Sequence, residues 1–161
     1  MLESSHMKHA YSLDQLSLVA QQVINDAFSD HQTRALLGAA VVGLEGDLGA
    51  GKTTLVKEIA SRFGVTDTVT SPTFVIAKWY DMEDAGHHFK KLVHIDAYRI
   101  EDEIELEAIH FDTLCQEEHA LVIVEWPDRI PHAMKKAKAI RFVLTHEGEE
   151  RQIDGPYQYE D

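Results

Sequence analysis

The sequence predicts an α/β fold of three layers, in which a mixed and mostly parallel central sheet lies between helices. Two observations support this prediction. Residues 39–45 and 121–125 are short apolar runs ending in an acid, and such runs are typical of strands buried on both faces. Segments with a helical period of apolar residues alternate with these runs. With 161 residues, the chain has the length of one domain, which we assign to residues 1–161.

The first element that we expect is an amphipathic helix near residues 13–29. Ser12 and Gln15 have the spacing of a capping box, and apolar residues then recur every three to four positions. Residues 1–10 are polar and lack the apolar run of a signal peptide. We expect them to be disordered or partly vector-derived, since residues 4–7 resemble a cloning remnant.

The run at residues 39–45 predicts a strand that leads directly into a glycine-rich loop. After this loop, apolar residues keep a helical period until Gly64, a suitable residue for the end of a helix. Residues 74–82 and 89–98 are rich in β-forming residues, and the polar segment between them favours a turn. These two segments predict an antiparallel hairpin at one side of the sheet.

The acidic start of residues 101–109 favours the N-terminus of a short helix. Three apolar residues of this helix are expected to face the core: Ile104, Ala108 and Ile109. Residues 121–125 predict a second central strand. Residues 139–145 and 151–157 predict two C-terminal antiparallel strands that close the sheet.

Composition limits the classes of function. The chain has 28 acidic and 15 basic residues, and the resulting formal charge of −13 repels the phosphate backbone of nucleic acids. We therefore expect no direct binding of RNA or DNA, and the acidic surface either aids solubility or faces a basic partner. The single Cys115 cannot form an internal disulfide, so a reducing cytoplasm is the simplest setting. The longest apolar stretch, residues 36–44, is far shorter than the ~20 residues that span a bilayer, and we expect no association with a membrane.

Residues 46–53 read GDLGAGKT and match the pattern G-x-x-x-x-G-K-[ST] at every fixed position. In such a loop, glycines let backbone N–H groups curl around phosphate oxygens, and the helix N-terminus adds positive potential. Lys52 then neutralises the β- and γ-phosphates, Thr53 places its hydroxyl on Mg²⁺, and Thr54 contacts the α-phosphate or begins the helix. The sequence thus predicts a P-loop NTPase fold that binds ATP or ADP with Mg²⁺ outside the carboxyl end of the preceding strand. The loop residues expected at the nucleotide are Asp47, Leu48, Gly49, Ala50, Gly51, Lys52, Thr53 and Thr54.

Two acids follow apolar strands and are candidates for metal binding and hydrolysis. Asp96 ends the run at residues 92–95, and Glu125 ends the more apolar run at residues 121–124, which better fits a central Walker B strand. Mg²⁺ prefers octahedral oxygen ligation and usually takes one or two carboxylates. One acid could hold the metal while the other orients the attacking water, and the sequence leaves open which does which. Either acid could instead cap a neighbouring loop.

Other residues near these motifs have a functional and a structural interpretation each. Thr73 lies where many P-loop NTPases sense the γ-phosphate, although a turn at the start of a strand is the simpler interpretation. Trp126 could stack on a base or pack against the sheet. Arg99 could bind a phosphate or hold Asp96, or it could form an ion pair at the surface. Three histidines show no metal-ligand spacing and are interpreted as hairpin surface and core: His87, His88 and His94.

Four segments form a series along the chain: GDLGAGKTT at residues 46–54, SPTF at 71–74, HIDAYR at 94–99 and EWP at 125–127. In this order they resemble the motifs of the TsaE (YjeE) family. The resemblance implies an ATPase that bacteria need to make N6-threonylcarbamoyladenosine on tRNA. It also implies that the protein acts on a TsaD–TsaB heterodimer, in which TsaD transfers the group, and reaches tRNA only through that partner.

The resemblance further implies roles for single residues. The implied catalytic residues are Lys52, Thr73, Asp96 and Glu125, and the implied metal ligands are Thr53, Glu125 and Asp96. Trp126 carries over as a residue beside the nucleotide. One departure from the family pattern is His110, because family members often have a small glycine at this point.

Three other classes of protein are alternatives to this ATPase. A small GTPase is disfavoured, because Asn25 is the only asparagine and the guanine-reading Asn-Lys-x-Asp motif is therefore absent. A small-molecule kinase needs an arginine-rich lid, but the arginines at positions 99, 129, 141 and 151 are widely spaced. A nucleotide-dependent binding module that hardly hydrolyses ATP stays open. No well-placed arginine finger is visible near the motifs, so we expect slow ATP hydrolysis without a partner.

Overall fold

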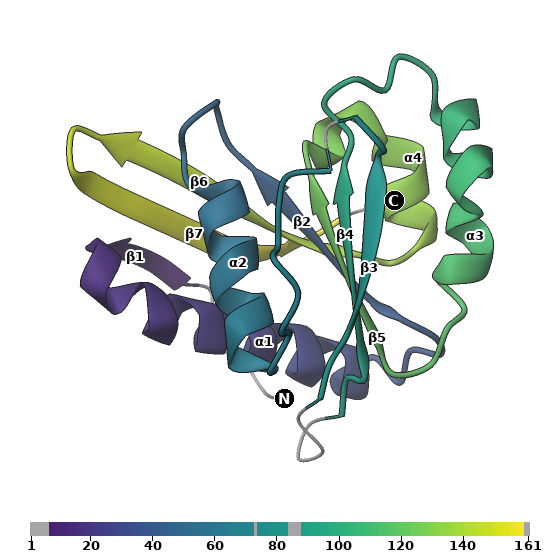
Figure 1. Cartoon of the computed structure of the whole chain (residues 1–161), viewed down its shortest axis with the longest axis horizontal. Helices are drawn as coiled ribbons and strands as arrows, with labels where there is room; N and C mark the ends of the chain where they lie inside the picture. Colours follow the sequence, from purple (N-terminus) through teal and green to yellow (C-terminus); the bar gives the residue numbers. More distant parts are fainter. Residues whose placement is uncertain (1–6, 73, 84–87, 160–161) are drawn as a thin grey trace.

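The computed structural model describes residues 7–72, 74–83 and 88–159 and contains one mixed sheet (Figure 1). Across the described residues, the sheet has seven strands in the order β1-β7-β6-β2-β5-β4-β3. The strands are β1 (Met7–Tyr11), β2 (Ala40–Glu45), β3 (Ala77–Asp81), β4 (Lys91–Asp96), β5 (Ala120–Glu125), β6 (Ile140–Glu147) and β7 (Glu150–Gln158). The helices are α1 (Leu16–Thr33), α2 (Lys52–Arg62), α3 (Phe111–Leu114) and α4 (Pro131–Lys136). Short 3₁₀ helices are η1 (Leu13–Gln15), η2 (Glu103–Ile109) and η3 (Pro127–Arg129).

The centre of the sheet is parallel and its margins are antiparallel. β2 pairs in parallel with both β5 and β6, and β5 pairs in parallel with β4. The outer strands β3, β7 and β1 run antiparallel to their neighbours. Apolar side chains fill both faces of β2 and β5, which suits strands covered by helices on two sides. The predicted fold class, with its hairpin at one side and its C-terminal antiparallel pair, is confirmed.

Two hydrophobic clusters lie on opposite faces of this sheet, and successive residues of β5 show the division. Leu121 and Ile123 pack in the cluster that contains α1 and α2, whereas Val122 and Val124 pack in the cluster that contains η2, α3 and α4. Figure 1 shows α1 and α2 on one side of the sheet and α3 and α4 on the other. The alternation follows from the two-residue period of a strand and produces the three predicted layers. Among the described residues, every helix is too short or too polar to span a lipid bilayer.

The predicted helix near residues 13–29 is confirmed as a 3₁₀ turn followed by α1, and its expected apolar residues are buried. The expectation of disorder over residues 1–10 is wrong for residues 7–10, while residues 1–6 lie outside the described residues. Met7–Tyr11 form β1, which pairs with β7, and Tyr11 is 3% exposed. The pairing of β1 depends on a strand some 140 positions later, and the local polarity of the segment does not reveal it.

The short helix expected at residues 101–109 forms as η2, and its inward face was predicted correctly only in part. Ile109 is half-buried and packs against the core, as expected, but Ile104 is 64% exposed and Ala108 is also exposed, while Leu106 is buried instead. A 3₁₀ helix has three residues per turn, so its core face repeats strictly every three positions, as at Leu106 and Ile109, and not at the four-residue spacing of Ile104 and Ala108. Asp102 accepts a hydrogen bond from the backbone N–H of Ile104, which explains the acidic start of the segment.

Candidate functional site

The loop between β2 and α2 reverses the chain at the carboxyl end of the central strand. Gly46 and Gly51 both have φ in the left-handed region, at 155° and 100°. A Cβ atom on Gly46 would lie 2.6 Å from the backbone oxygen of Leu144 in β6, and one on Gly51 would collide with Nη1 of Arg151 in β7. Both positions therefore require glycine, and the C-terminal strands bound the loop from one side.

Lys52 begins α2 and folds back over the loop. Its Nζ donates hydrogen bonds to the backbone oxygens of Gly46 and Asp47, the latter at 2.9 Å, and lies 4.3 Å from the centre of the Trp126 ring. Burial lowers the pKa of the Lys52 ammonium, and four nearby carboxylates oppose that shift. These carboxylates belong to Glu125, Asp96, Asp47 and Asp128. The Lys52 ammonium is therefore largely buried in the loop and surrounded by carboxylates.

Glu125 is 2% exposed and lies at the end of β5, where both of its carboxylate oxygens accept hydrogen bonds. The hydroxyl of Thr53 donates to Oε1 at 2.7 Å, and Nε2 of His94 donates to Oε2 at 2.7 Å. The P-loop helix and the β5 acid are therefore in direct contact. Both groups supply oxygen atoms, which are the donors that Mg²⁺ prefers, so the site fits this ion.

Asp96 is the neighbour of Glu125 in the β4–β5 register and is 7% exposed. Its Oδ2 accepts a hydrogen bond from the Ser71 hydroxyl at 3.2 Å, and its Oδ1 accepts one from the backbone N–H of Tyr98 at 3.0 Å. Asp96 therefore joins the acid pair to the segment between α2 and β3. Among the described residues, no group of three or more His, Cys, Asp or Glu side chains could hold a metal ion.

Trp126 follows Glu125 and adopts a left-handed conformation with φ of 59°. Its ring lies beside Lys52 and also packs against Tyr98, at 5.0 Å between ring centres. The indole therefore packs against its neighbours and borders the loop, and its stacking on a base stays a prediction. The guanidinium of Arg99 lies over the ring of Phe74, 4.7 Å from its centre, and its contact with a phosphate stays a prediction.

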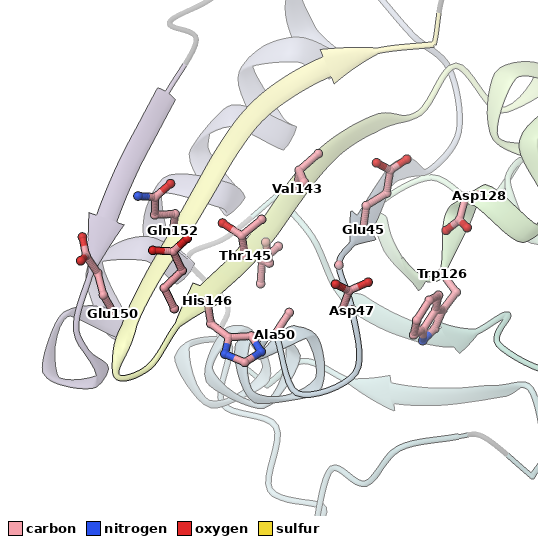
Figure 2. Close-up of a pocket in the computed structure, with 13 residues that line it drawn as sticks. Glu45, Asp47, Ala50, Trp126, Asp128, Val143, Thr145, His146, Glu150 and Gln152 are labelled. Carbon is pink, nitrogen blue, oxygen red and sulfur yellow. The ribbon is translucent and has the colours of Figure 1, made fainter.

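A cavity of about 720 Å³ opens beside the loop (Figure 2). Asp47 and Ala50 line its floor, Trp126 and Asp128 form one wall, and the β6–β7 hairpin forms the opposite wall. Thr145, His146, Glu150 and Gln152 are among the hairpin residues that line it. Sequence reasoning missed this wall, because these residues carry no motif and reach the loop only through the pairing of β6 with β2.

Of the residues predicted for the site, the structure brings together Lys52, Thr53, Asp96, Glu125 and Trp126. Thr73 lies outside the described residues. Within the loop, Ala50 is buried, whereas Asp47, Leu48, Gly49 and Thr54 are exposed at its surface.

Sequence reasoning missed the contacts of His94 and Ser71 with the two acids. The position of His94, two residues before Asp96 on one strand, could have indicated that both side chains share a face. His110, the departure from the family pattern, adopts a left-handed conformation with φ of 52°, which is the conformation that a glycine favours.

Comparisons with known proteins identify the family to which the chain is similar. The family model described as "Threonylcarbamoyl adenosine biosynthesis protein TsaE" matches residues 14–153. A Bacillus subtilis protein named tRNA threonylcarbamoyladenosine biosynthesis protein TsaE is 38% identical over 118 residues, which cover 70% of this chain and 66% of the relative. A Streptomyces coelicolor protein of the same name is 39% identical over 94 residues, which cover 58% of this chain and 60% of the relative. This chain thus spans about 60 to 66% of the length of these curated relatives.

Among solved structures, the crystal structure of Bacillus subtilis YdiB is similar to this chain, with a TM-score of 0.63 and 26% identity. The superposition covers 92% of this chain and 84% of YdiB. The similarity therefore extends over nearly the whole fold described above.

Proposed function

Because the chain belongs to the TsaE family, we propose that it serves the biosynthesis of threonylcarbamoyladenosine on tRNA as a Mg²⁺-dependent ATPase. The observation that carries this proposal is the 2.7 Å hydrogen bond from the Thr53 hydroxyl to Glu125. It joins the P-loop helix to the acid at the end of a central parallel strand. This arrangement of hydroxyl, carboxylate and adjacent lysine is what a metal-bound nucleoside triphosphate requires.

In the proposed complex, the backbone N–H groups of residues 46–53 surround the β- and γ-phosphates. Lys52 leaves the carbonyl oxygens of Gly46 and Asp47 and pairs with these phosphates, since an ammonium gains more from phosphate oxygens than from neutral carbonyls. The cavity beside Asp47 and Trp126 has room for ribose and base, and the β6–β7 hairpin lines its far side. ADP would occupy the same site without the γ-phosphate.

The two acids are proposed to have different roles. Glu125 is proposed to hold Mg²⁺ together with Thr53, because these two side chains are already hydrogen-bonded. Bound Mg²⁺ would neutralise charge on the phosphate oxygens. Asp96 faces Ser71 and the segment after α2, and it is proposed to orient the attacking water. Thr73, in the same segment, is proposed as the residue that responds to the γ-phosphate.

The partner is proposed to be a TsaD–TsaB heterodimer, which would hold the tRNA and transfer the group. A formal charge of −13 disfavours independent tRNA binding and thus supports contact with tRNA only through the partner. Slow hydrolysis by the isolated chain is expected, because the guanidinium groups of Arg99 and Arg129 lie over the rings of Phe74 and Tyr98. The guanidinium of Arg151 borders the loop at Gly51, on the side of the C-terminal strands. Binding to the partner would then accelerate turnover.

Two measurements test the proposal. Titration calorimetry of the purified chain should show binding of ATP and ADP that Mg²⁺ strengthens for ATP, and Lys52→Ala should weaken it. Phosphate release should be slow for the chain alone and faster when a TsaD–TsaB pair is added. No heat of binding with either nucleotide would overturn the proposed site, while fast release without any partner would overturn the proposed dependence on one.

A further inference from the structure

His94 is a buried histidine in β4 that makes one hydrogen bond with its ring. The side chain is 0% exposed, and Nε2 donates to Oε2 of Glu125 at 2.7 Å. The other ring nitrogen, Nδ1, is also buried and has no hydrogen-bond partner among the residues that the structure describes. A buried imidazole that loses water on both nitrogens and regains one hydrogen bond reduces the stability of the fold, so stability alone does not explain a histidine at this position.

The strand register explains how the ring reaches Glu125. His94 lies two residues before Asp96, so both side chains point to the face of β4 that packs toward α2. In the β4–β5 register, Asp96 is paired with Glu125. His94 is paired with Ile123, which lies two residues before Glu125 and farther from the carboxyl ends of the strands. The imidazole therefore approaches Glu125 from inside the sheet, while Thr53 approaches it from α2.

These two donors hold different oxygens of the same carboxylate. A glutamate side chain has three rotatable bonds, and a single hydrogen bond to Thr53 leaves its carboxylate free to turn. The bond from His94 to Oε2 removes that freedom and keeps Oε1 on the side of Thr53. Partners of this kind, which orient a ligand without touching the metal, typically change metal affinity or activity by about 10–100-fold when removed.

We infer that His94 is a positioning residue, whose Nε2–H fixes Oε2 of Glu125 so that Oε1 stays directed at Thr53 and the Mg²⁺–nucleotide. This inference rests on the proposed function, because it assigns Glu125 to the metal side of that site. His94 itself touches neither nucleotide nor metal.

The test compares His94→Gln with His94→Asn, two variants that carry the same amide on side chains of different length. The glutamine amide nitrogen can occupy the position of Nε2, whereas the asparagine amide is one carbon shorter and cannot reach Glu125. The readout is the ATP dissociation constant, measured with Mg²⁺ and again in excess EDTA. Damage to the fold changes both values together, whereas loss of positioning changes the Mg²⁺ value alone.

His94→Asn is expected to raise the dissociation constant with Mg²⁺ by about 10–100-fold and to leave the EDTA value within about three-fold of wild type. His94→Gln is expected to stay close to wild type in both conditions. The matched control is His31→Asn, because His31 is also buried, bonds through Nε2 to the backbone oxygen of Gly38 at 3.0 Å and leaves Nδ1 unpartnered among the described residues. This control should lower the melting temperature without changing the effect of Mg²⁺.

The possible outcomes distinguish failure of the inference about His94 from failure of the proposed function. If wild type binds ATP with a clear Mg²⁺ effect and His94→Asn keeps that effect, the inference is wrong and the proposed function stands. If wild type binds no ATP, both are wrong.

If His94→Asn does not fold, the proton NMR spectrum of the wild-type chain provides a second test of the inference. The ring Nε2–H resonance, assigned by its absence in His94→Gln, should persist after Mg²⁺ and ADP are added. Its loss on that addition would show that the bond to Glu125 breaks when the site fills, which overturns the inference.

Discussion

Asp96 and Glu125 are paired residues at the carboxyl ends of two parallel strands, yet their carboxylates contact different parts of the molecule. Glu125 accepts a hydrogen bond from Thr53 in the P-loop helix, and Asp96 accepts one from Ser71 in the segment that follows this helix. Neighbouring acids in one site can therefore have separate roles. These contacts are the reason for our proposal that Glu125 serves the metal and Asp96 the attacking water.

Substitution of each acid should separate these roles. Glu125→Gln is expected to reduce both hydrolysis and the gain in ATP affinity that Mg²⁺ provides. Asp96→Asn is expected to reduce hydrolysis by about 100-fold or more, while the Mg²⁺-dependent affinity stays within about three-fold of wild type. Calorimetry and phosphate release, with partner added, measure both effects. Identical behaviour of the two variants would contradict a division of labour.

Lys52→Ala should weaken ATP binding by about 10–100-fold, because a charge-assisted contact with phosphate contributes about 1.5–3 kcal/mol. Lys52→Arg serves as a second variant that keeps the charge. The ammonium lies close to the Trp126 ring, and Lys52 as a residue is 5% exposed, so a wider, planar guanidinium should not fit and should restore little affinity. Full recovery of affinity in Lys52→Arg would show that charge alone, without the fit in the loop, is sufficient.

Two glycines of the loop allow a matched test of whether the C-terminal strand β7 restrains the loop. Gly49 and Gly51 both have positive φ, at 81° and 100°, so alanine strains the backbone at either position. A Cβ on Gly51 collides with the Arg151 guanidinium, whereas the nearest atom to a Cβ on Gly49 is Nε2 of His146 at 4.0 Å.

Gly51→Ala should therefore destabilise the fold more than Gly49→Ala in chemical denaturation, by roughly 0.5–1.5 kcal/mol, because the end of the flexible Arg151 side chain has to move. Adding Arg151→Ala to Gly51→Ala should recover part of this loss, because it removes the colliding group. Equal stability of the two single variants would mean that the arginine moves aside freely. In that case the C-terminal strands would not restrain the loop.

The sequence predicted the parts of the site that depend on local pattern. The loop, its helix and the two acids at strand ends each follow from residues within one short segment. His94 was assigned to surface or core, because its bond to Glu125 depends on the register between two strands about thirty residues apart. The cavity wall formed by the β6–β7 hairpin was missed for the same reason, since β6 reaches the loop by pairing with β2.

A group of three histidines, His31, His88 and His119, should make the stability of the fold depend on pH. His88 and His119 precede β4 and β5, so the group lies at the opposite end of these strands from the two acids. The rings of His88 and His119 are 4.7 Å apart between centres, and those of His31 and His88 are 6.2 Å apart. Burial lowers the pKa of His88 from its usual 6.5, and the neighbouring charges of His119, His31 and Lys90 lower it further. The folded chain therefore binds a proton at His88 less readily than the unfolded chain does.

The sign of the effect follows from this difference. When the folded pKa lies below the unfolded value, the stabilisation is fully present above the unfolded pKa and is lost as the pH falls below about 6.5. The melting temperature should thus decrease between about pH 7.5 and pH 5.5, and His88→Gln should reduce that decrease. His146→Gln is the control, because His146 is exposed on β6 and lies outside this group. A pH dependence that is unchanged in His88→Gln but altered in His146→Gln would show that the repulsion among these three rings does not govern acid stability.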